Sequence, residues 1–191
     1  MIHPRRYGRM RAALLLVFVA VGCALRPAEP ATGALTREQV EQNLATQAEE
    51  IGRAVLAEDH ARMADLTHPE LVKKLGGREK YVARLGGIAA EMKAAGFRFE
   101  ALATARPSTL VQASGKWFGV VPSDIDMTGP GGARTKMKAY QVGESVDGGR
   151  TWRFIDANGV GGDRRKLNLI LPDFPADVPV PANPPPQWDR G

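Results

Sequence analysis

Apolar residues between positions 36 and 95 recur at three- and four-residue steps, which is the spacing of one face of an α-helix. Thr36 followed three residues later by Gln39 has the form of a capping box, a pattern typical of a helix start. These signals predict a first helix from Thr36 to about position 56. Its buried stripe is expected to contain Val40, Leu44, Ala48, Ile51, Val55 and Leu56.

Two further helices are expected before position 96. Asp59 is a suitable cap for a short second helix, which should end at Thr67-His68-Pro69 because a residue before proline avoids the helical region. After one more turn over residues 71–75, a third helix is predicted from about Arg78 to Ala95, with Gly96 closing it. Its expected buried side comprises Tyr81, Val82, Leu85, Ile88, Ala89 and Met92.

From Phe97 the pattern changes to the alternation of apolar and polar residues that is typical of β-strands. Glycine-rich turn sequences separate the expected strands, and such short connections favour an antiparallel meander. A short helix is expected after Asp163. The predicted fold class is α+β, with three N-terminal helices packed on a strongly curved antiparallel meander sheet. The strands are expected at 97–103, 109–113, 117–127, 135–146 and 151–156.

The composition changes at both ends of the chain. Four arginines and an apolar run over residues 12–21 lead to Ala20-Val21-Gly22-Cys23, which contains the only cysteine of the 191 residues. Residues 23–35 have the composition of a flexible tether. Residues 172–191 contain seven prolines, so we expect a polyproline-like, partly disordered tail there. The predicted segments are therefore a leader (1–22), a tether (23–35), one domain (36–171) and a proline-rich tail (172–191).

The N-terminal segment resembles the signal and lipobox of bacterial lipoproteins. That resemblance implies cleavage before Cys23, acylation of its thiol and new amine, and anchoring in the cell envelope. Because no aspartate follows Cys23, it also implies the outer membrane, facing the periplasm. The alternatives are a secretory signal cut elsewhere or a short membrane helix, although the apolar run is about half of the roughly 20 residues that span a bilayer.

The net charge and the single cysteine argue against several classes of function. The net charge of +5 includes the four leader arginines, so the residues from Cys23 onward carry 22 Lys+Arg against 21 Asp+Glu. No basic block remains that would favour nucleic-acid binding. A lipidated Cys23 leaves no thiol for cysteine catalysis, thiolate zinc sites or iron–sulfur clusters. We expect no cofactor and no metal site.

The order of elements from Thr36 to Ile170 resembles the cone fold of the nuclear transport factor 2-like superfamily, which includes polyketide cyclases, ketosteroid isomerases and many non-catalytic binding domains. The resemblance implies helices over one face of the sheet and an apolar pocket between them. Dimerisation through the sheet is common in that superfamily, so a homodimer is a further expectation. A fold does not by itself transmit a function.

Four residues are candidates for acid–base chemistry. His68 lies at a helix end and could titrate near neutral pH, although an ordinary loop histidine has the same sequence context. Asp124 and Asp126 share one face of a strand, and so do Lys136 and Lys138 on the next strand, so a cross-strand charge ladder is the favoured interpretation. Asp156 ends the last strand, a position that the cone resemblance places near the pocket.

Aromatic residues give weaker candidates for a ligand pocket, namely Tyr81, Trp117 and Tyr140, for which core packing is the alternative. The stretch from Ser145 to Trp152 fits the Asp-box pattern of sialidases. In those proteins the box is a structural hairpin, and we expect a structural role here as well.

The leading functional hypothesis is a lipid-anchored envelope protein whose domain is a non-enzymatic binding or assembly module for an apolar small ligand or a partner protein. The alternative is a small isomerase- or dehydratase-type enzyme with a histidine or aspartate general base in the cone pocket. A third possibility is a structural lipoprotein whose proline-rich tail engages a partner.

Overall fold

The computed structural model describes residues 33–180, 182 and 187–189. Cys23, the predicted leader and most of the predicted tether lie outside the described residues, as do several prolines of the tail. The helices are α1 (Arg37–Leu56), α2 (His60–Leu66), α3 (Pro69–Lys74), α4 (Arg78–Ala94), α5 (Ala157–Val160) and α6 (Arg164–Asn168). The strands are β1 (Arg98–Thr104), β2 (Thr109–Ala113), β3 (Lys116–Thr128), β4 (Arg134–Ser145), β5 (Arg153–Asp156) and β6 (Gln187–Asp189), with a 3₁₀ turn, η1 (Pro130–Gly132), between β3 and β4.

The described chain has four helices before its first strand, and not the three that we predicted. The additional helix is α3, where we expected only a turn. It begins at Pro69. Proline is favourable at a first helical position because a backbone N–H at that position would have no acceptor within the helix, so the helix loses no hydrogen bond. The start of α1 is as predicted: Thr36 Oγ1 accepts from the Gln39 amide, and Gln39 Oε1 accepts from the Thr36 amide at 2.9 Å.

The strands form one antiparallel sheet, which confirms the α+β class. The meander is confirmed for β3, β4 and β5, but β1 and β2 do not pair with each other. Instead, β2 pairs with the first part of β3 and β1 with its last part, so both strands lie along the same edge of β3. The length of β3 makes this possible, because its 13 residues offer room for two shorter partners.

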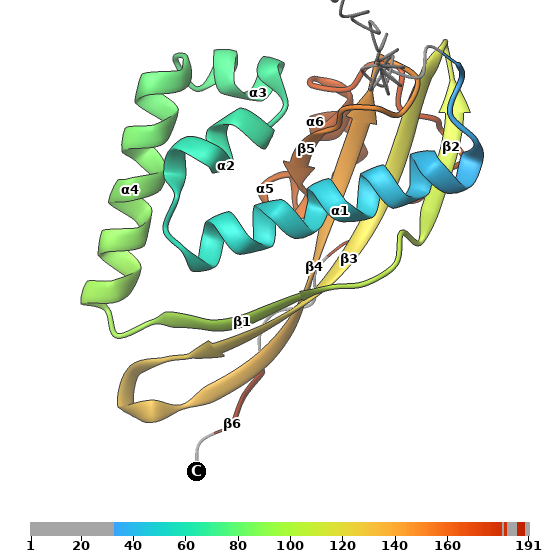
Figure 1. The fold of residues 1–191 in the computed structure, drawn as a ribbon. Helices are drawn as coiled ribbons and strands as arrows, with labels where there is room; N and C mark the ends of the chain where they lie inside the picture. The colour runs from blue at the N-terminus through green and yellow to red at the C-terminus, as the bar shows by residue number, and fades with distance from the viewer. Residues whose placement is uncertain (1–32, 181, 183–186, 190–191) are drawn as a thin grey trace, which may run out of the picture. The chain divides into compact units, whose positions relative to one another are not determined.

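Helix α1 crosses one face of the sheet, as Figure 1 shows. Its Leu44 side chain sits against two strand glycines, Gly119 and Gly143, and a Cβ at Gly119 would lie only 2.2 Å from Leu44 Cδ2. The close approach therefore requires glycine at position 119. The apolar cluster on this face comprises Val40, Leu44, Ala48, Ile51, Leu66, Leu110, Val121, Trp152 and Phe154.

The opposite face is covered by α5, α6 and the segment that follows Leu171. Phe174 packs edge-to-face on Phe118 with ring centroids 5.7 Å apart, and Val178 is also buried. Arg164 fastens the segment by donating to the carbonyl oxygens of Pro175, at 2.9 Å, and Val178. The expectation of a polyproline-like, partly disordered tail from position 172 does not hold for residues 172–178, because the apolar residues between the prolines complete the core.

Helix α4 packs on α2 and α3. The fully buried side that we predicted for it is wrong. None of its residues is buried, and Ile88 is 44% exposed. Its Gly86 faces the ring of His60 on α2. No helix in the described part of the chain is both long and apolar enough to cross a bilayer.

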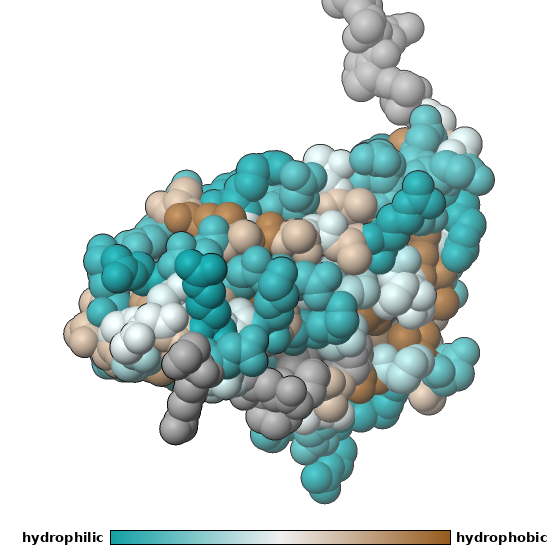
Figure 2. All heavy atoms as spheres, turned by 90° about the horizontal axis from the view of Figure 1, so that it is seen from below, coloured by the Kyte–Doolittle hydropathy of each residue, from teal (hydrophilic) through white to brown (hydrophobic). Residues whose placement is uncertain are grey.

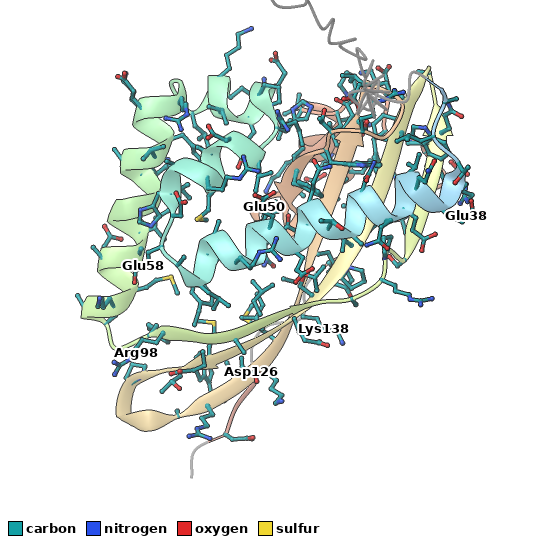
Figure 3. All side chains as sticks on the ribbon, in the orientation of Figure 1. Glu38, Glu50, Glu58, Arg98, Asp126 and Lys138 are labelled. Carbon is teal, nitrogen blue, oxygen red and sulfur yellow. The ribbon has the colours of Figure 1, made fainter. Side chains whose placement is uncertain are left out.

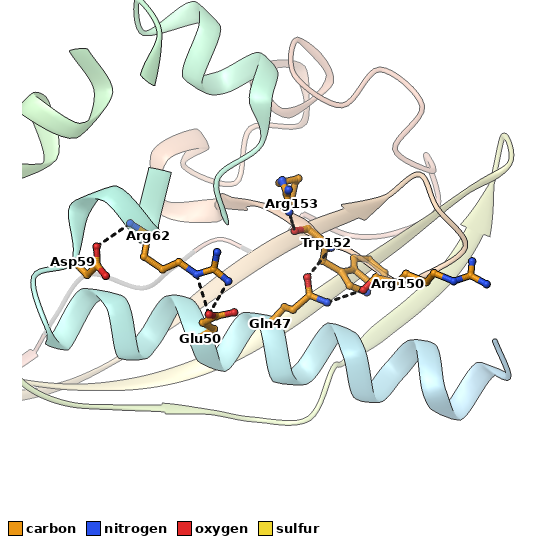
Figure 4. Close-up of polar contacts among 7 residues, drawn as sticks. All are labelled: Gln47, Glu50, Asp59, Arg62, Arg150, Trp152 and Arg153. Atoms are coloured by element: carbon orange, nitrogen blue, oxygen red, sulfur yellow. Dashed lines mark hydrogen bonds and ion pairs between the residues drawn. The ribbon is translucent and has the colours of Figure 1, made fainter. Parts of the chain in front are cut away.

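The predicted Asp-box hairpin is confirmed. Asp147 Oδ1 accepts from the amides of Arg150, at 3.0 Å, and Thr151, at 2.9 Å, while Trp152 beneath the turn is fully buried. Gly148 and Gly149 take the positive φ angles of 75° and 90° that the turn requires. Gln47 of α1 joins the helix to this turn, because its side-chain amide donates to the Arg150 carbonyl and accepts from the Trp152 amide, each at 2.9 Å (Figure 4).

Candidate functional site

A buried network of charged side chains connects four separate segments. His68 Nε2 lies 2.9 Å from Glu144 Oε2, and Lys116 Nζ lies 3.0 Å from Glu144 Oε1 and 2.9 Å from Asp173 Oδ2. His68 is 5% exposed and Glu144 8% exposed, whereas Lys116 and Asp173 lie nearer the surface. The network connects the link between α2 and α3 with the start of β3, the end of β4 and the C-terminal segment.

The backbone places His68 at the edge of the sheet. Thr67 forms a parallel bridge with Phe154, and the His68 amide donates to the Phe154 carbonyl at 2.8 Å. This short pairing covers the edge of β5, which would otherwise present unpaired amides and carbonyls. It also turns the His68 side chain towards Glu144 on β4.

The Glu144 carboxylate stays ionised in this buried position. Burial raises its pKa, but the hydrogen bonds with His68 and Lys116 outweigh burial and hold the pKa below its ordinary value. The other ring nitrogen of His68, Nδ1, is buried and has no hydrogen-bond partner among the described residues. With Nε2 committed to Glu144, the described contacts make His68 a member of a structural hydrogen-bond network.

A shallow hollow that is open to solvent over most of its extent lies directly beside this network. Its volume is about 500 Å³. Thr67 and Pro69 line it, while His68 between them belongs to the charged network. The full lining is Ala64, Asp65, Thr67, Pro69, Val72, Lys73, Gly76, Gly77, Arg78 and Arg153.

Cationic side chains dominate the charge of the hollow. Arg78 Nε lies 2.7 Å from Asp65 Oδ1, and this hydrogen bond lowers the pKa of Asp65. Arg153, at the start of β5, donates through Nη1 to the carbonyl oxygen of Trp152 at 2.9 Å (Figure 4). Lys73 adds a third cation. The lining thus carries three positive charges against one negative charge.

A second group of polar residues lies on the sheet face that α1 covers. Asp156 stands opposite Gln141 in the β4–β5 register, and Thr104 stands opposite Ser123 in the β1–β3 register. Gln141 Oε1 and Thr104 Oγ1 are buried without a hydrogen-bond partner in the part of the chain that the structure describes. Asp156 caps α5 by accepting from the Asn158 amide at 2.9 Å. Although part of its surface is exposed, desolvation by the surrounding protein raises the pKa of Asp156.

The paired aspartates on β3 form the predicted charge ladder. Asp124 lies 2.7 Å from Lys138, and Asp126 lies 3.5 Å from Lys136. Figure 3 shows Asp126 and Lys138 pointing away from α1, so the ladder is remote from the helix-covered face. This confirms the favoured interpretation of the pair. Figure 2 shows that polar residues cover most of the coloured surface on the side viewed from below, with apolar residues in separate patches.

The three aromatic pocket candidates do not come together. Tyr81 is on α4, with its hydroxyl 3.4 Å from Thr67 Oγ1. Trp117 packs with the cluster under α1 and lies below the Arg37 guanidinium, 5.9 Å from the ring centroid. Tyr140 packs with the cluster on the opposite face of the sheet. Of the three, only Tyr81 is close to a residue that lines the hollow.

Sequence reasoning found His68 and missed its partners. Strand alternation contained a signal for them, because Lys116 shares a face with Phe118 and Glu144 shares a face with Val142, both of which are core residues. Arg153 carries the same signal, because it shares a face of β5 with the core residue Ile155. Within the described residues, no group of three or more histidine, aspartate, glutamate or cysteine side chains is placed to hold a metal ion.

Comparisons of the chain with protein-family models, with curated proteins and with solved structures find no match.

Proposed function

We propose that the chain is a lipid-anchored protein of the bacterial cell envelope whose folded part is a non-enzymatic binding module. The proposal for the anchor rests on the lipobox-like sequence ending at Cys23. The compartment that follows is the outer membrane, on its periplasmic side. The cone superfamily remains the proposed family, and a homodimer through the sheet remains part of the proposal.

The observation that carries the binding function is the hollow beside the α2–α3 link. It is large enough for a small ligand, and its lining combines apolar residues such as Val72 and Pro69 with a few charged ones. The acid–base candidates support a binding role over catalysis, because Asp124 and Asp126 pair with lysines and His68 pairs with Glu144. A general base needs a position within reach of its substrate.

Two measurements test this proposal. Intact mass spectrometry of the full chain isolated from a bacterial membrane should give a mass that corresponds to cleavage before Cys23 plus acyl chains. Extraction of the same preparation with organic solvent, which removes noncovalently bound molecules, should yield a co-purified small molecule. An unmodified Cys23 would contradict the anchor, and a Val72→Trp variant that retains the same small molecule would contradict binding in the hollow.

A second candidate function is an isomerase-type enzyme that uses Asp156 as general base. The favouring observation is its raised pKa beside Gln141, whose Oε1 lacks a partner among the described residues. Such an enzyme would exchange the proton next to the carbonyl of an apolar cyclic ketone with deuterium from heavy water. Proton NMR detects that exchange, and an Asp156→Asn variant should abolish it. Absence of exchange by the unaltered chain would rule out this chemistry for that substrate class.

A further inference from the structure

The charges around the hollow are unevenly compensated. Asp65 is committed to Arg78 by their 2.7 Å contact. Lys73 has Glu70 at 3.9 Å, and both of these side chains are well exposed to water, where such a pair contributes little. Arg153 has no carboxylate within 4 Å among the described residues. Arg153 does interact electrostatically with Asp65, which also lines the hollow, and thereby helps to lower the pKa of Asp65. One carboxylate is thus shared by two arginines of the lining, and the cations remain in excess.

Arg153 is well suited to bind an anion. Its guanidinium has five N–H donors in a planar fork, and the carbonyl of Trp152 occupies only Nη1 in the described contacts. That carbonyl contact also restricts the guanidinium of a residue that lines the hollow. A fork of this kind matches the two oxygens of a carboxylate or a phosphate.

Apart from Thr67, the rest of the lining is small or apolar. Ala64 comes from α2, Pro69 and Val72 from α3, and two glycines from the loop that precedes α4. These residues leave room for an apolar group and offer it few polar partners. The lining of the hollow thus combines apolar residues with an excess of cationic ones.

We propose that the hollow binds a small molecule that carries an anionic group on an apolar body, with Arg153 and Lys73 holding the anion and Val72 and Pro69 contacting the body. This inference rests on the proposed function, because it assigns a ligand class to the same site. The anionic group could belong to a free acid or to the head of a membrane lipid, and the two sources share the chemistry that the hollow recognises.

The test uses the full chain in nanodiscs of phosphatidylcholine, which carry no net charge. Isothermal titration calorimetry compares naphthoate, an apolar body with a carboxylate, with naphthamide, its neutral counterpart of the same shape. We expect naphthoate to bind at least about tenfold more tightly, since a charge-assisted contact to a guanidinium is among the stronger hydrogen bonds.

Two variants distinguish binding in the hollow from nonspecific attraction to positive charge on the surface. Arg153→Gln should weaken naphthoate binding about tenfold and leave naphthamide binding unchanged. The control is Arg134→Gln, which removes an exposed arginine from β4, a strand that contributes no residue to the lining. It should not change the affinity for either compound.

The outcomes distinguish the two proposals. Equal binding of naphthoate and naphthamide, sensitive to Val72→Trp, would overturn the anionic class and leave the binding function standing. Absence of binding by both compounds would overturn the two proposals together. If naphthoate binds as expected, its displacement by phosphatidylglycerol added to the nanodiscs assigns the anion to a lipid head, and an unchanged affinity assigns it to a free acid.

Discussion

Replacing Glu144 with glutamine tests whether the buried charged network stabilises the fold. In the Glu144→Gln variant the new amide oxygen can still accept from Lys116, but the –NH₂ group then faces His68 Nε2. His68 must become the tautomer with its proton on Nδ1, and that buried atom has no partner among the described residues. The variant therefore loses a buried negative charge and leaves one donor unsatisfied.

The size of the loss follows from these contacts. Each hydrogen bond to a charged group contributes about 1.5–3 kcal/mol net, and one of the two at Glu144 is replaced by a weaker one. Adding the unsatisfied Nδ1–H, we expect the free energy of unfolding to fall by about 2–4 kcal/mol. Urea denaturation of the full chain at pH 7, followed by tryptophan fluorescence, measures it.

The pH dependence gives this prediction a definite sign. The pKa of Glu144 is lower in the folded chain than its ordinary value of 4.5, so the network's contribution is complete above that value. It is lost as the pH falls through the folded-state pKa, because the protonated carboxyl no longer pairs with Lys116. The stability difference between the unaltered chain and Glu144→Gln should therefore be full at pH 7 and shrink below 4.5.

A matched control is Asp124→Asn, which makes the same chemical change in an exposed pair. Asp124 and Lys138 are 2.7 Å apart, yet both side chains are 59% exposed, so water and salt screen their attraction. We expect a much smaller loss for this variant. The reasoning would be refuted by equal losses in the two variants, or by a Glu144→Gln difference that does not change with pH.

Three further predictions concern packing and turns, and urea denaturation measures each of them. Gly119→Ala should lower the free energy of unfolding by about 1–3 kcal/mol because the added Cβ would overlap Leu44. Its control is Gly87→Ala in α4, which has open space around it and should raise the free energy of unfolding by about 0.5–1 kcal/mol. Equal effects of the two substitutions would contradict the role of the close approach at Gly119. Phe174→Ala should lower the free energy of unfolding by about 3 kcal/mol if the segment after Leu171 is part of the core, and a neutral result would favour the partly disordered tail that the sequence predicts. Asp147→Ala should cost about 2 kcal/mol through the lost bonds to the turn amides, and an unchanged stability would show that the glycines alone define the turn.

The features predicted correctly from sequence are those whose partners are close together in the chain. Thr36 and Gln39 are three residues apart, and the Asp147 turn closes within four. The ladder of Asp124 with Lys138 crosses one hairpin, whose turn sequence fixes the register. In each case a local rule names both partners, so one sequence was sufficient to predict the contact.

The features that were missed depend on distant partners or on short segments. Glu144 and His68 are 76 positions apart, and no rule of spacing relates them. Helix α3 has six residues, too few for a periodic pattern. The prediction for the tail relied on its prolines and did not consider Phe174 and Val178, which lie between them and are buried in the core. Periodicity also could not show that α4 has little to pack against.

The charged network and the hollow share one wall, and this makes them energetically dependent on each other. Thr67 and Pro69 line the hollow, while His68 between them is held by Glu144. If the His68–Glu144 hydrogen bond fixes this link, breaking it increases the conformational freedom that a ligand must remove on binding. We therefore expect Glu144→Gln to weaken naphthoate binding severalfold under conditions where the variant remains folded, although Glu144 does not line the hollow. The Arg153→Gln variant should weaken binding without the loss of stability. A Glu144→Gln chain that binds naphthoate as tightly as the unaltered chain would show that the α2–α3 link keeps its shape without the network.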